Sequence, residues 1–221
     1  MKRLISFDLD QTLVITTKAH SLSFKYAFKK MGMDVKEKAI WPLIDGRHSH
    51  EVILSIAKKI KKRLNEEQIK EIRELHHHFL RKTKKYAKPM PGAKKTLDKL
   101  KKDYDLALLT NCGKEEASFL LDASKLNKKI FDVIILADQV KHPKPWPDEI
   151  FKAEKILHIK SDIHVGDSVY DMIAAKKAKA ISIAVLSGQS TKKQLQKLKP
   201  DFIIKKITEL PEVIKKAELL L

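Results

Sequence analysis

The chain has 221 residues, and its 46 lysine and arginine residues against 28 aspartate and glutamate residues give a formal net charge of +18. This length suffices for one hydrophobic core and a smaller second unit, since domains commonly contain about 100 to 200 residues. The single cysteine excludes an intrachain disulfide framework. Apolar runs are too short for a signal peptide or a membrane-spanning helix. We therefore expect a soluble, cytoplasmic protein with no membrane partner.

The excess of positive charge is typical of proteins that bind nucleic acids. Only five of the 46 basic residues are arginines, however, and the lysines are spread along the chain in pairs such as Lys29-Lys30 and Lys176-Lys177. They form no recognisable nucleic-acid-binding motif. A lysine-rich solvated surface is the favoured interpretation, and nucleic acid is not an expected partner.

The first predicted element is a strand over Leu4–Asp8, where an apolar run ends in two carboxylates. Asp8 and Asp10 are one residue apart and therefore lie on the same side of an extended segment. Such a pair repels itself and usually requires a cation or a shared proton. The pair suggests a metal site, acid–base chemistry or both, although a strand that ends in an acidic turn would have the same sequence.

A long interval after this strand shows helical patterns and no convincing strand. The expected helices are Leu22–Met31, Glu51–Leu64 and Glu66–Tyr86. Two prolines in Lys88-Pro-Met-Pro91 mark the return from this insert, before a helix over Ala93–Lys101. Three consecutive histidines at 76–78 point roughly 100° apart on a helix, so we do not expect them to share one metal ion.

The remainder of the chain alternates apolar strands with amphipathic helices, which predicts crossover units and a mostly parallel sheet. Continuous apolar strands indicate that helices cover both faces of the sheet. The later strands are expected at Leu106–Thr110, Val133–Ala137, Ile163–Asp167, Ile181–Leu186 and Phe202–Ile204, with helices at Lys114–Ala123, Asp148–His158, Tyr170–Ala178 and Thr191–Lys197. The predicted class is α/β: a Rossmann-like, mostly parallel sheet with an inserted all-helical domain.

Polar side chains follow the predicted strands at the edge where functional groups of parallel sheets collect. They are Asp8, Asp10, Thr110, Asn111, Lys144, Asp167 and Asp171. Carboxylate oxygens suit Mg²⁺, whereas an ammonium, a hydroxyl and an amide suit phosphate oxygens. Phosphoryl transfer requires this combination, because its catalysis is mainly alignment and neutralisation of charge.

Four short motifs occur in a fixed order along the chain: Asp8-x-Asp10-x-Thr12-Leu13-Val14, Thr110-Asn111, Lys144-Pro145-x-Pro147 and Gly166-Asp167-x-x-x-Asp171. In this order and spacing they resemble the motifs of the haloacid dehalogenase superfamily of phosphatases, especially its phosphoglycolate phosphatase-like branch. The resemblance implies a catalytic core formed by residues 1–14 and 88–221. It also implies that residues 15–87 form a helical cap domain.

The resemblance further implies a mechanism. Asp8 would attack phosphorus and form an aspartyl-phosphate intermediate. Asp10 would protonate the leaving oxygen and then activate the hydrolytic water. Thr110, Asn111 and Lys144 would bind the phosphoryl group.

The metal implied by the resemblance is Mg²⁺. Its ligands would be Asp8, the backbone carbonyl of Asp10, and Asp167, with Asp171 acting through water. Many relatives have glycine where this chain has Gln11, so Gln11 is expected to have an unusual φ or a less flexible turn.

Substrate choice is expected to depend on the cap, which closes over the core in this branch. Arg47, between predicted cap helices, could reach a carboxylate or a second phosphate, although a plain surface arginine is an alternative. The expected substrate is a small phosphorylated metabolite. The sequence does not define the oligomeric state.

Two other functions are consistent with parts of the sequence. A sugar-phosphate mutase would share the motifs, but such enzymes often have adjacent acidic residues in the last motif, and here only Asp167 stands there. A non-catalytic basic protein that binds nucleic acid or an acidic partner would not need Asp8 and Asp10 together with Lys144.

Overall fold

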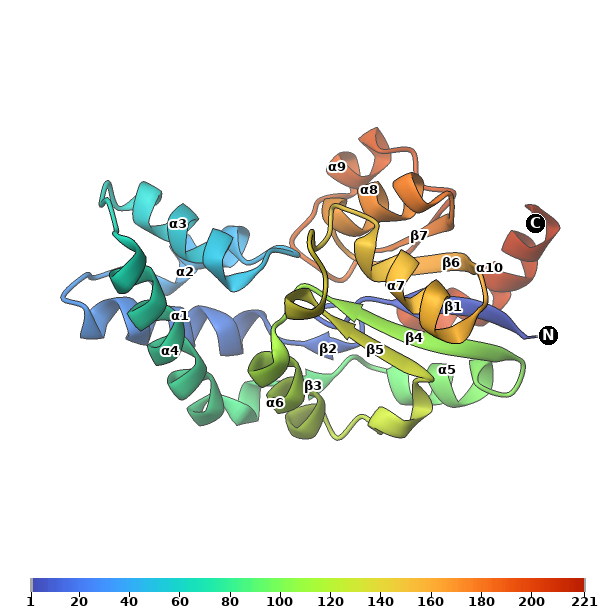
Figure 1. Cartoon of the computed structure of the whole chain (residues 1–221), viewed down its shortest axis with the longest axis horizontal. Coiled ribbons are helices and arrows are strands. Elements are labelled where there is room, and N and C mark those ends of the chain that lie inside the picture. The colour runs from blue at the N-terminus through green and yellow to red at the C-terminus, as the bar shows by residue number, and fades with distance from the viewer. Residues whose placement is uncertain (1, 221) are drawn as a thin grey trace.

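The computed structural model describes residues 2–220, which form an α/β core and an adjacent lobe of helices (Figure 1). The core contains a six-stranded sheet in the order β5-β4-β1-β6-β7-β8, and every neighbouring pair is parallel. The strands are β1 (Arg3–Phe7), β4 (Tyr104–Thr110), β5 (Val133–Leu136), β6 (Ser161–Gly166), β7 (Ile181–Val185) and β8 (Phe202–Ile204).

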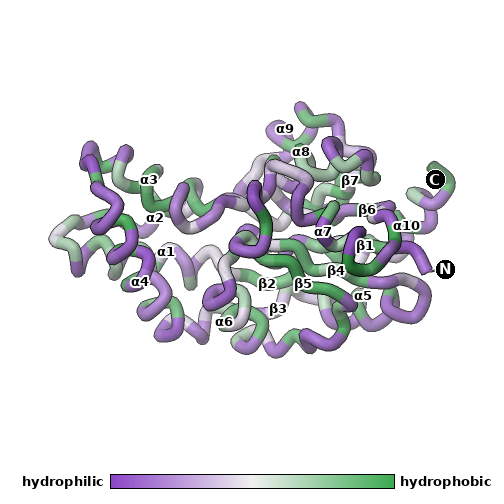
Figure 2. The backbone as a smooth tube through the Cα atoms, in the orientation of Figure 1, coloured by the Kyte–Doolittle hydropathy of each residue, from purple (hydrophilic) through white to green (hydrophobic). Residues whose placement is uncertain are grey.

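Helices cover both faces of this sheet, because its strands are apolar on both sides. Ile5 and Phe7 of β1 pack in a core with α5 (Ala93–Leu100), α6 (Lys114–Ser124) and α10 (Leu210–Ala217). Leu4 lies in a second core with α7 (Asp148–Leu157) and α8 (Val169–Ala178). A shorter helix, α9 (Lys192–Lys197), packs beside α8. Figure 2 shows the hydrophobic residues concentrated along the strands of the core.

The lobe of helices contains α1 (Thr17–Lys30), α2 (Glu37–Ile40), α3 (Ser49–Lys59) and α4 (Glu66–Lys82), with α1 packed against α4. It has its own hydrophobic core, which includes Phe24, Phe28, Ile53, Ile56 and Ile72. The two connections to the α/β core pair as short antiparallel strands, β2 (Val14–Ile15) and β3 (Lys88–Pro89). Short 3₁₀ helices complete the structure at Trp41–Leu43, Lys84–Tyr86, Lys128–Ile130, Ala137–Gln139, Ile207–Glu209 and Glu218–Leu220.

The predicted fold class is confirmed, and each of the six core strands occurs within two residues of its expected bounds. Several details differ. The helices α2 and α10 were not expected. The first expected helix of the insert begins at Thr17 rather than Leu22, and the helix expected over Glu66–Tyr86 ends at Lys82. The helix expected over Glu51–Leu64 ends at Lys59, because Lys61 takes a φ of 56°. The strands β2 and β3 were not expected, because two residues are too few to show a period.

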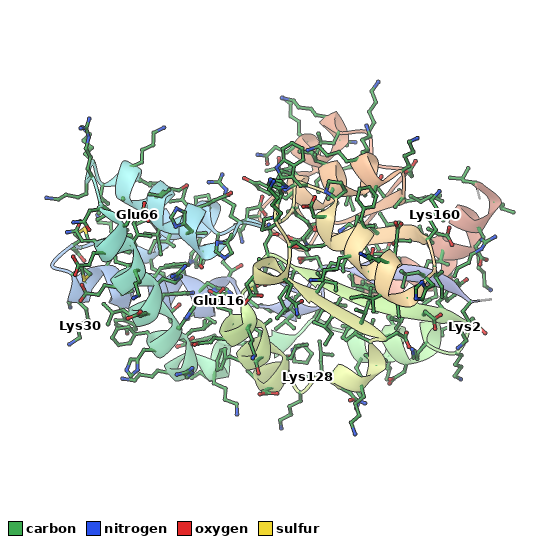
Figure 3. All side chains as sticks on the ribbon, in the orientation of Figure 1. Lys2, Lys30, Glu66, Glu116, Lys128 and Lys160 are labelled. Atoms are coloured by element: carbon green, nitrogen blue, oxygen red, sulfur yellow. The ribbon has the colours of Figure 1, made fainter. Side chains whose placement is uncertain are left out.

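Lysine side chains project from the periphery of both lobes, as Lys2, Lys30, Lys128 and Lys160 do in Figure 3. This arrangement agrees with the interpretation of a solvated basic surface. None of the helices in residues 2–220 is long and apolar enough to cross a membrane.

Candidate active site

Asp8 and Asp10 lie directly beyond the carboxyl end of β1, at the edge of the sheet that faces the helical lobe. The backbone N–H of Asp8 donates to the carbonyl of Val165, which ties the chain to β6 after the last residue of the strand. Gln11 then takes a φ of 57°, so the unusual backbone expected at this position is present. Its side-chain oxygen accepts hydrogen bonds from the backbone N–H groups of Thr16 and Thr17 at 2.6 and 3.2 Å. The turn therefore aims Asp8 and Asp10 across the sheet edge and also caps the start of α1.

Lys144 lies between two carboxylates. Its ammonium nitrogen is 2.6 Å from Asp8 Oδ1 and 2.8 Å from Asp171 Oδ1, and it also donates to the carbonyl of Leu109 at 3.0 Å. All three charged side chains are buried. Although burial alone would raise it, the ammonium of Lys144 holds the pKa of Asp171 well below its ordinary value. Asp171 also accepts from the N–H and hydroxyl of Ser168, so it is fixed as the anion that positions Lys144.

A candidate metal site is formed by Asp8, Asp167 and Asp171, each of which offers a carboxylate oxygen within 4.8 Å of the others. Burial raises the pKa of both Asp8 and Asp167. Repulsion from Asp171 and Asp10 adds to the rise for Asp8, and repulsion from Asp8 and Asp171 adds to it for Asp167. Asp167 Oδ1 accepts from the hydroxyl of Thr12 at 2.8 Å. Both oxygens of Asp171 are held by Lys144 and Ser168, whereas Asp8 is held by Lys144 at one oxygen only and Asp167 has no positively charged partner in residues 2–220. Asp167 and the second oxygen of Asp8 are therefore the groups open to a cation. This oxygen-only donor set fits Mg²⁺.

The carboxylate of Asp10 is held at both oxygens. His20 Nε2 lies 3.0 Å from Oδ1, and the thiol of Cys112 donates to Oδ2 at 2.9 Å. Although burial opposes the change, these hydrogen bonds lower the pKa of Asp10. Burial lowers the pKa of His20, but the hydrogen bond and charge of Asp10 raise it by more. Asp10 and His20 therefore form a pair that shares one proton, in which His20 is buried and Asp10 is partly exposed.

Thr110 and Asn111 lie at the end of β4, next to Lys144. Thr110 is buried and its hydroxyl oxygen accepts the backbone N–H of Cys112 at 3.1 Å, which leaves its O–H free to donate. The side-chain amide of Asn111 donates to the carbonyl of Gly46 at 2.7 Å and to that of Lys144 at 2.9 Å. Asn111 thus joins the loop of the helical lobe to the loop of Lys144.

A pocket lies between the two lobes. Its core wall includes Asp8, Asp10, Thr110, Asn111, Cys112 and Glu116, and its other wall includes His20, Phe24, Ile44, Gly46, Arg47, Ser49 and Val52. Arg47 donates from Nη1 to Ser55 at 2.9 Å, whereas its buried Nε has no hydrogen-bond partner within residues 2–220. Of the residues predicted from sequence, seven meet at one sheet edge and Arg47 reaches the same pocket.

Sequence reasoning missed the residues that hold the predicted ones in place. His20, Ser168 and Glu116 contact or adjoin the site, but each is an isolated polar residue in a helix or turn. Thr12 belongs to the first motif, but its contact with Asp167 was not predicted. The contact between Ser168 and Asp171 could have been predicted from sequence, because residues of these types three positions apart form a capping box. The structure contains this capping box at the start of α8.

Comparisons with known proteins place the chain among hydrolases. The family model described as haloacid dehalogenase-like hydrolase matches residues 5–185. The pyrophosphatase PpaX of Bacillus mycoides is 28% identical over 216 residues, covering 95% of each chain, and that of Bacillus cereus is 28% identical over 215 residues.

Solved structures share the whole architecture. A predicted phosphoglycolate phosphatase from Haemophilus somnus has a TM-score of 0.85 at 24% identity, covering 96% of this chain and 98% of the other. A hydrolase from Pseudomonas syringae has a TM-score of 0.84 at 24% identity, covering 98% and 99%. The resemblance inferred from the four motifs, and the prediction of a hydrolytic enzyme, are confirmed. The chain belongs to the haloacid dehalogenase-like hydrolase family.

Proposed function

We propose that this protein is a Mg²⁺-dependent phosphatase that hydrolyses a small phosphorylated metabolite through a phosphoryl group carried on Asp8. The observation that carries the proposal is the buried arrangement around Asp8: Lys144 is 2.6 Å from one oxygen, and Asp10, held by His20, lines the same pocket. A nucleophile and a second carboxylate that can hold a proton are thus available on one wall. The alignment of charged groups matches the demands of phosphoryl transfer.

Each residue of the proposed active site has a separate role in phosphoryl transfer. Lys144 neutralises Asp8 as the phosphate dianion approaches and contacts a phosphoryl oxygen afterwards. The free O–H of Thr110 donates to another phosphoryl oxygen. Asp10 gives the proton that it shares with His20 to the leaving oxygen, and then takes one from the attacking water. Asp8, Asp167 and the backbone carbonyl of Asp10 would hold Mg²⁺, which would add positive charge to that supplied by Lys144.

The pocket supports a small substrate. Its walls combine the apolar Phe24, Ile44 and Val52 with the polar Arg47 and Ser49, so a leaving group of a few carbon atoms would be enclosed when the lobes are closed. Residues 15–87 are the proposed cap domain, with the core formed by residues 1–14 and 88–221. The PpaX relatives are named as pyrophosphatases, which makes inorganic pyrophosphate one substrate to assay.

The test is release of phosphate from a generic aryl phosphate and from a panel of small phosphate esters and pyrophosphate, with and without Mg²⁺. We expect activity only with Mg²⁺, its loss in Asp8→Asn, and its retention in the control Asp98→Asn, since Asp98 is exposed on α5. Activity of Asp8→Asn equal to that of the unmodified protein would refute the mechanism. Transfer of phosphate between positions of a sugar, without release, would instead identify a mutase.

The role of Arg47 is tested with the same panel. If its unpartnered Nε contacts an anionic leaving group, Arg47→Ala raises KM at least about tenfold for substrates with a second anionic group. It should leave KM unchanged for an aryl phosphate whose leaving group carries no charge. An equal effect on both would show that Arg47 only shapes the cap.

A further inference from the structure

Three buried side chains meet where the helical lobe touches the core. His20 comes from α1 and His76 from α4, whereas Glu116 comes from α6 of the core and is labelled at the boundary of the lobes in Figure 3. Each is at most 4% exposed. One ligand atom from each lies within 4.8 Å of the other two. We call these three residues the interface cluster.

One ring nitrogen of His76, Nε2, faces the carboxylate of Glu116. The hydroxyl of Ser23 donates to the carbonyl of His20 at 2.8 Å, and its oxygen also lies 2.8 Å from His76 Nδ1. In one tautomer of His76 the Nδ1–H donates to Ser23, and Nε2 presents a lone pair to Glu116 Oε1 at 2.8 Å. In the other tautomer Nδ1 accepts from Ser23, and the Nε2–H donates to Glu116.

With protons on both ring nitrogens, His76 would donate to Ser23 and to Glu116 together. Burial opposes the second proton and lowers the pKa of His76 to about 4. Glu116 is ionised at neutral pH, because its hydrogen bond with His76 lowers its pKa to about 2 although burial opposes the change. In the Nδ1–H tautomer of His76, a lone pair and an anion face each other and can bind a cation between them.

His20 offers a third donor in the same way. Its Nε2 is engaged with Asp10, and its Nδ1 is buried without a hydrogen-bond partner in residues 2–220. Histidine ligands of metals usually have one nitrogen held by a carboxylate or another polar group, which orients the second nitrogen. Both histidines of the interface cluster have this arrangement, with Asp10 behind His20 and Ser23 behind His76.

We propose that His20, His76 and Glu116 form a second metal site, distinct from the carboxylate site, that binds Zn²⁺ and ties the helical lobe to the core. Two imidazoles and one carboxylate are a donor set that Zn²⁺ accepts, whereas Mg²⁺ prefers oxygen ligands alone. Zn²⁺ would replace the proton on His20 Nδ1 and would insert between His76 and Glu116. Ligands about 2 Å from Zn²⁺ in tetrahedral geometry lie about 3.3 Å apart, so the His76–Glu116 pair would open slightly from 2.8 Å, and atoms up to 4.8 Å apart would approach by at most about 1.5 Å.

Such a site has a mechanical consequence. Two ligands belong to the lobe and one to the core, so Zn²⁺ would bridge them and hold the pocket closed. Opening of a cap is required for substrate entry and product release. Zn²⁺ would therefore slow turnover at saturating Mg²⁺, and a chelator selective for Zn²⁺ over Mg²⁺ would restore it.

The test is titration of the full chain with Zn²⁺ by calorimetry in saturating Mg²⁺, which occupies the carboxylate site. We expect one Zn²⁺ per chain, a higher Tm with Zn²⁺, and Co²⁺ in place of Zn²⁺ to give the intense visible absorption of tetrahedral coordination. His76→Gln and Glu116→Gln should weaken binding at least about 100-fold. The control His78→Gln should bind like the unmodified protein, because His78 is exposed on the same helix.

Two outcomes would overturn the site. The first is absence of Zn²⁺ binding by the unmodified protein, which decides the matter even if the buried variants fail to fold. The second is loss of binding in Cys112→Ser with a sulfur-to-metal band in the Co²⁺ spectrum, which would assign the ion to the neighbouring group of Asp10, His20 and Cys112. The binding readout needs no turnover, so failure of the proposed phosphatase activity would leave this result separate.

Discussion

Lys144 lies 2.6 Å from Asp8, and both side chains are almost entirely removed from solvent. A carboxylate so deeply buried would ordinarily retain its proton, and a protonated carboxyl is not a nucleophile. The ammonium of Lys144 opposes the effect of burial on Asp8. Lys144 is itself anchored by Asp171 on its other side, so its position does not depend on bound substrate.

Replacement of Lys144 tests this relationship. Lys144→Met should lower kcat/KM on the order of 100- to 1,000-fold, because Asp8 loses its positive neighbour and the phosphoryl group loses a donor. Steady-state kinetics in saturating Mg²⁺ measure the effect. Lys155→Met on the exposed side of α7 is the control. A loss of less than tenfold would contradict the role of Lys144.

Gly188 should be necessary for the metal site. A Cβ at this position would lie 1.7 Å from Asp167 Oδ2 and 3.0 Å from Asp167 Cβ, so the carboxylate would have to move. Gly188→Ala should raise the Mg²⁺ concentration for half-maximal activity at least about tenfold. Gly113→Ala is a matched control, since its Cβ would approach only Asp138, at 3.9 Å. Equal Mg²⁺ dependence in the two variants would show that Asp167 is not a ligand.

Gln11 has a strained, left-handed backbone and a side chain that accepts two hydrogen bonds from the start of α1. Gln11→Ala keeps the φ of 57° and loses the two hydrogen bonds to the start of α1, so it should lower the free energy of unfolding by about 1 kcal/mol. Gln11→Gly loses the same bonds but relieves a backbone cost of about 1 kcal/mol. Urea denaturation should therefore place the glycine variant near the unmodified protein. A glycine variant no more stable than the alanine variant would contradict this account.

Glu149 should make stability depend on pH. It is fully buried, and neither carboxylate oxygen has a hydrogen-bond partner within residues 2–220. Burial raises its pKa to about 7 from an ordinary 4.5, with Lys144 opposing the rise. The folded state therefore keeps a proton that the unfolded chain releases above pH 4.5, and the stability that it contributes is lost as pH rises toward 7.

Glu149→Gln should thus increase the free energy of unfolding at pH 8 by about 2 to 4 kcal/mol and have little effect near pH 4.5. Urea titrations at both pH values measure the difference. The exposed Glu71→Gln serves as the control. A stabilisation that does not change with pH would show that Glu149 does not titrate in this range.

The sheet and the core residues of the site could be predicted from sequence, because functional groups of parallel sheets lie just beyond the carboxyl ends of the strands and each strand end is recognised from a few neighbouring residues. Asp8, Thr110, Lys144 and Asp167 each follow an apolar strand, and parallel strands bring their ends together. Gln11 could also be anticipated as an unusual turn residue. These features need only a short window of sequence.

Contacts between distant helices could not be predicted. His76 and Glu116 are 40 positions apart, and their meeting depends on how the lobe of helices packs on the core. His20 is 10 positions from Asp10, across a turn whose direction is fixed by Gln11. The consecutive histidines 76–78 illustrate the point, because only His76 is fully buried, and its partners come from other elements.

The central claim is that Asp8 carries the phosphoryl group, and trapping that group tests it most directly. Asp10→Asn retains the nucleophile but cannot activate water, so acid quenching after mixing with an aryl phosphate and Mg²⁺ should capture the intermediate. We predict close to one acid-stable, alkali-labile phosphoryl group per chain, located on Asp8 by peptide mass spectrometry. Absence of the adduct while aryl alcohol is still released, or its location on another residue, would contradict the account.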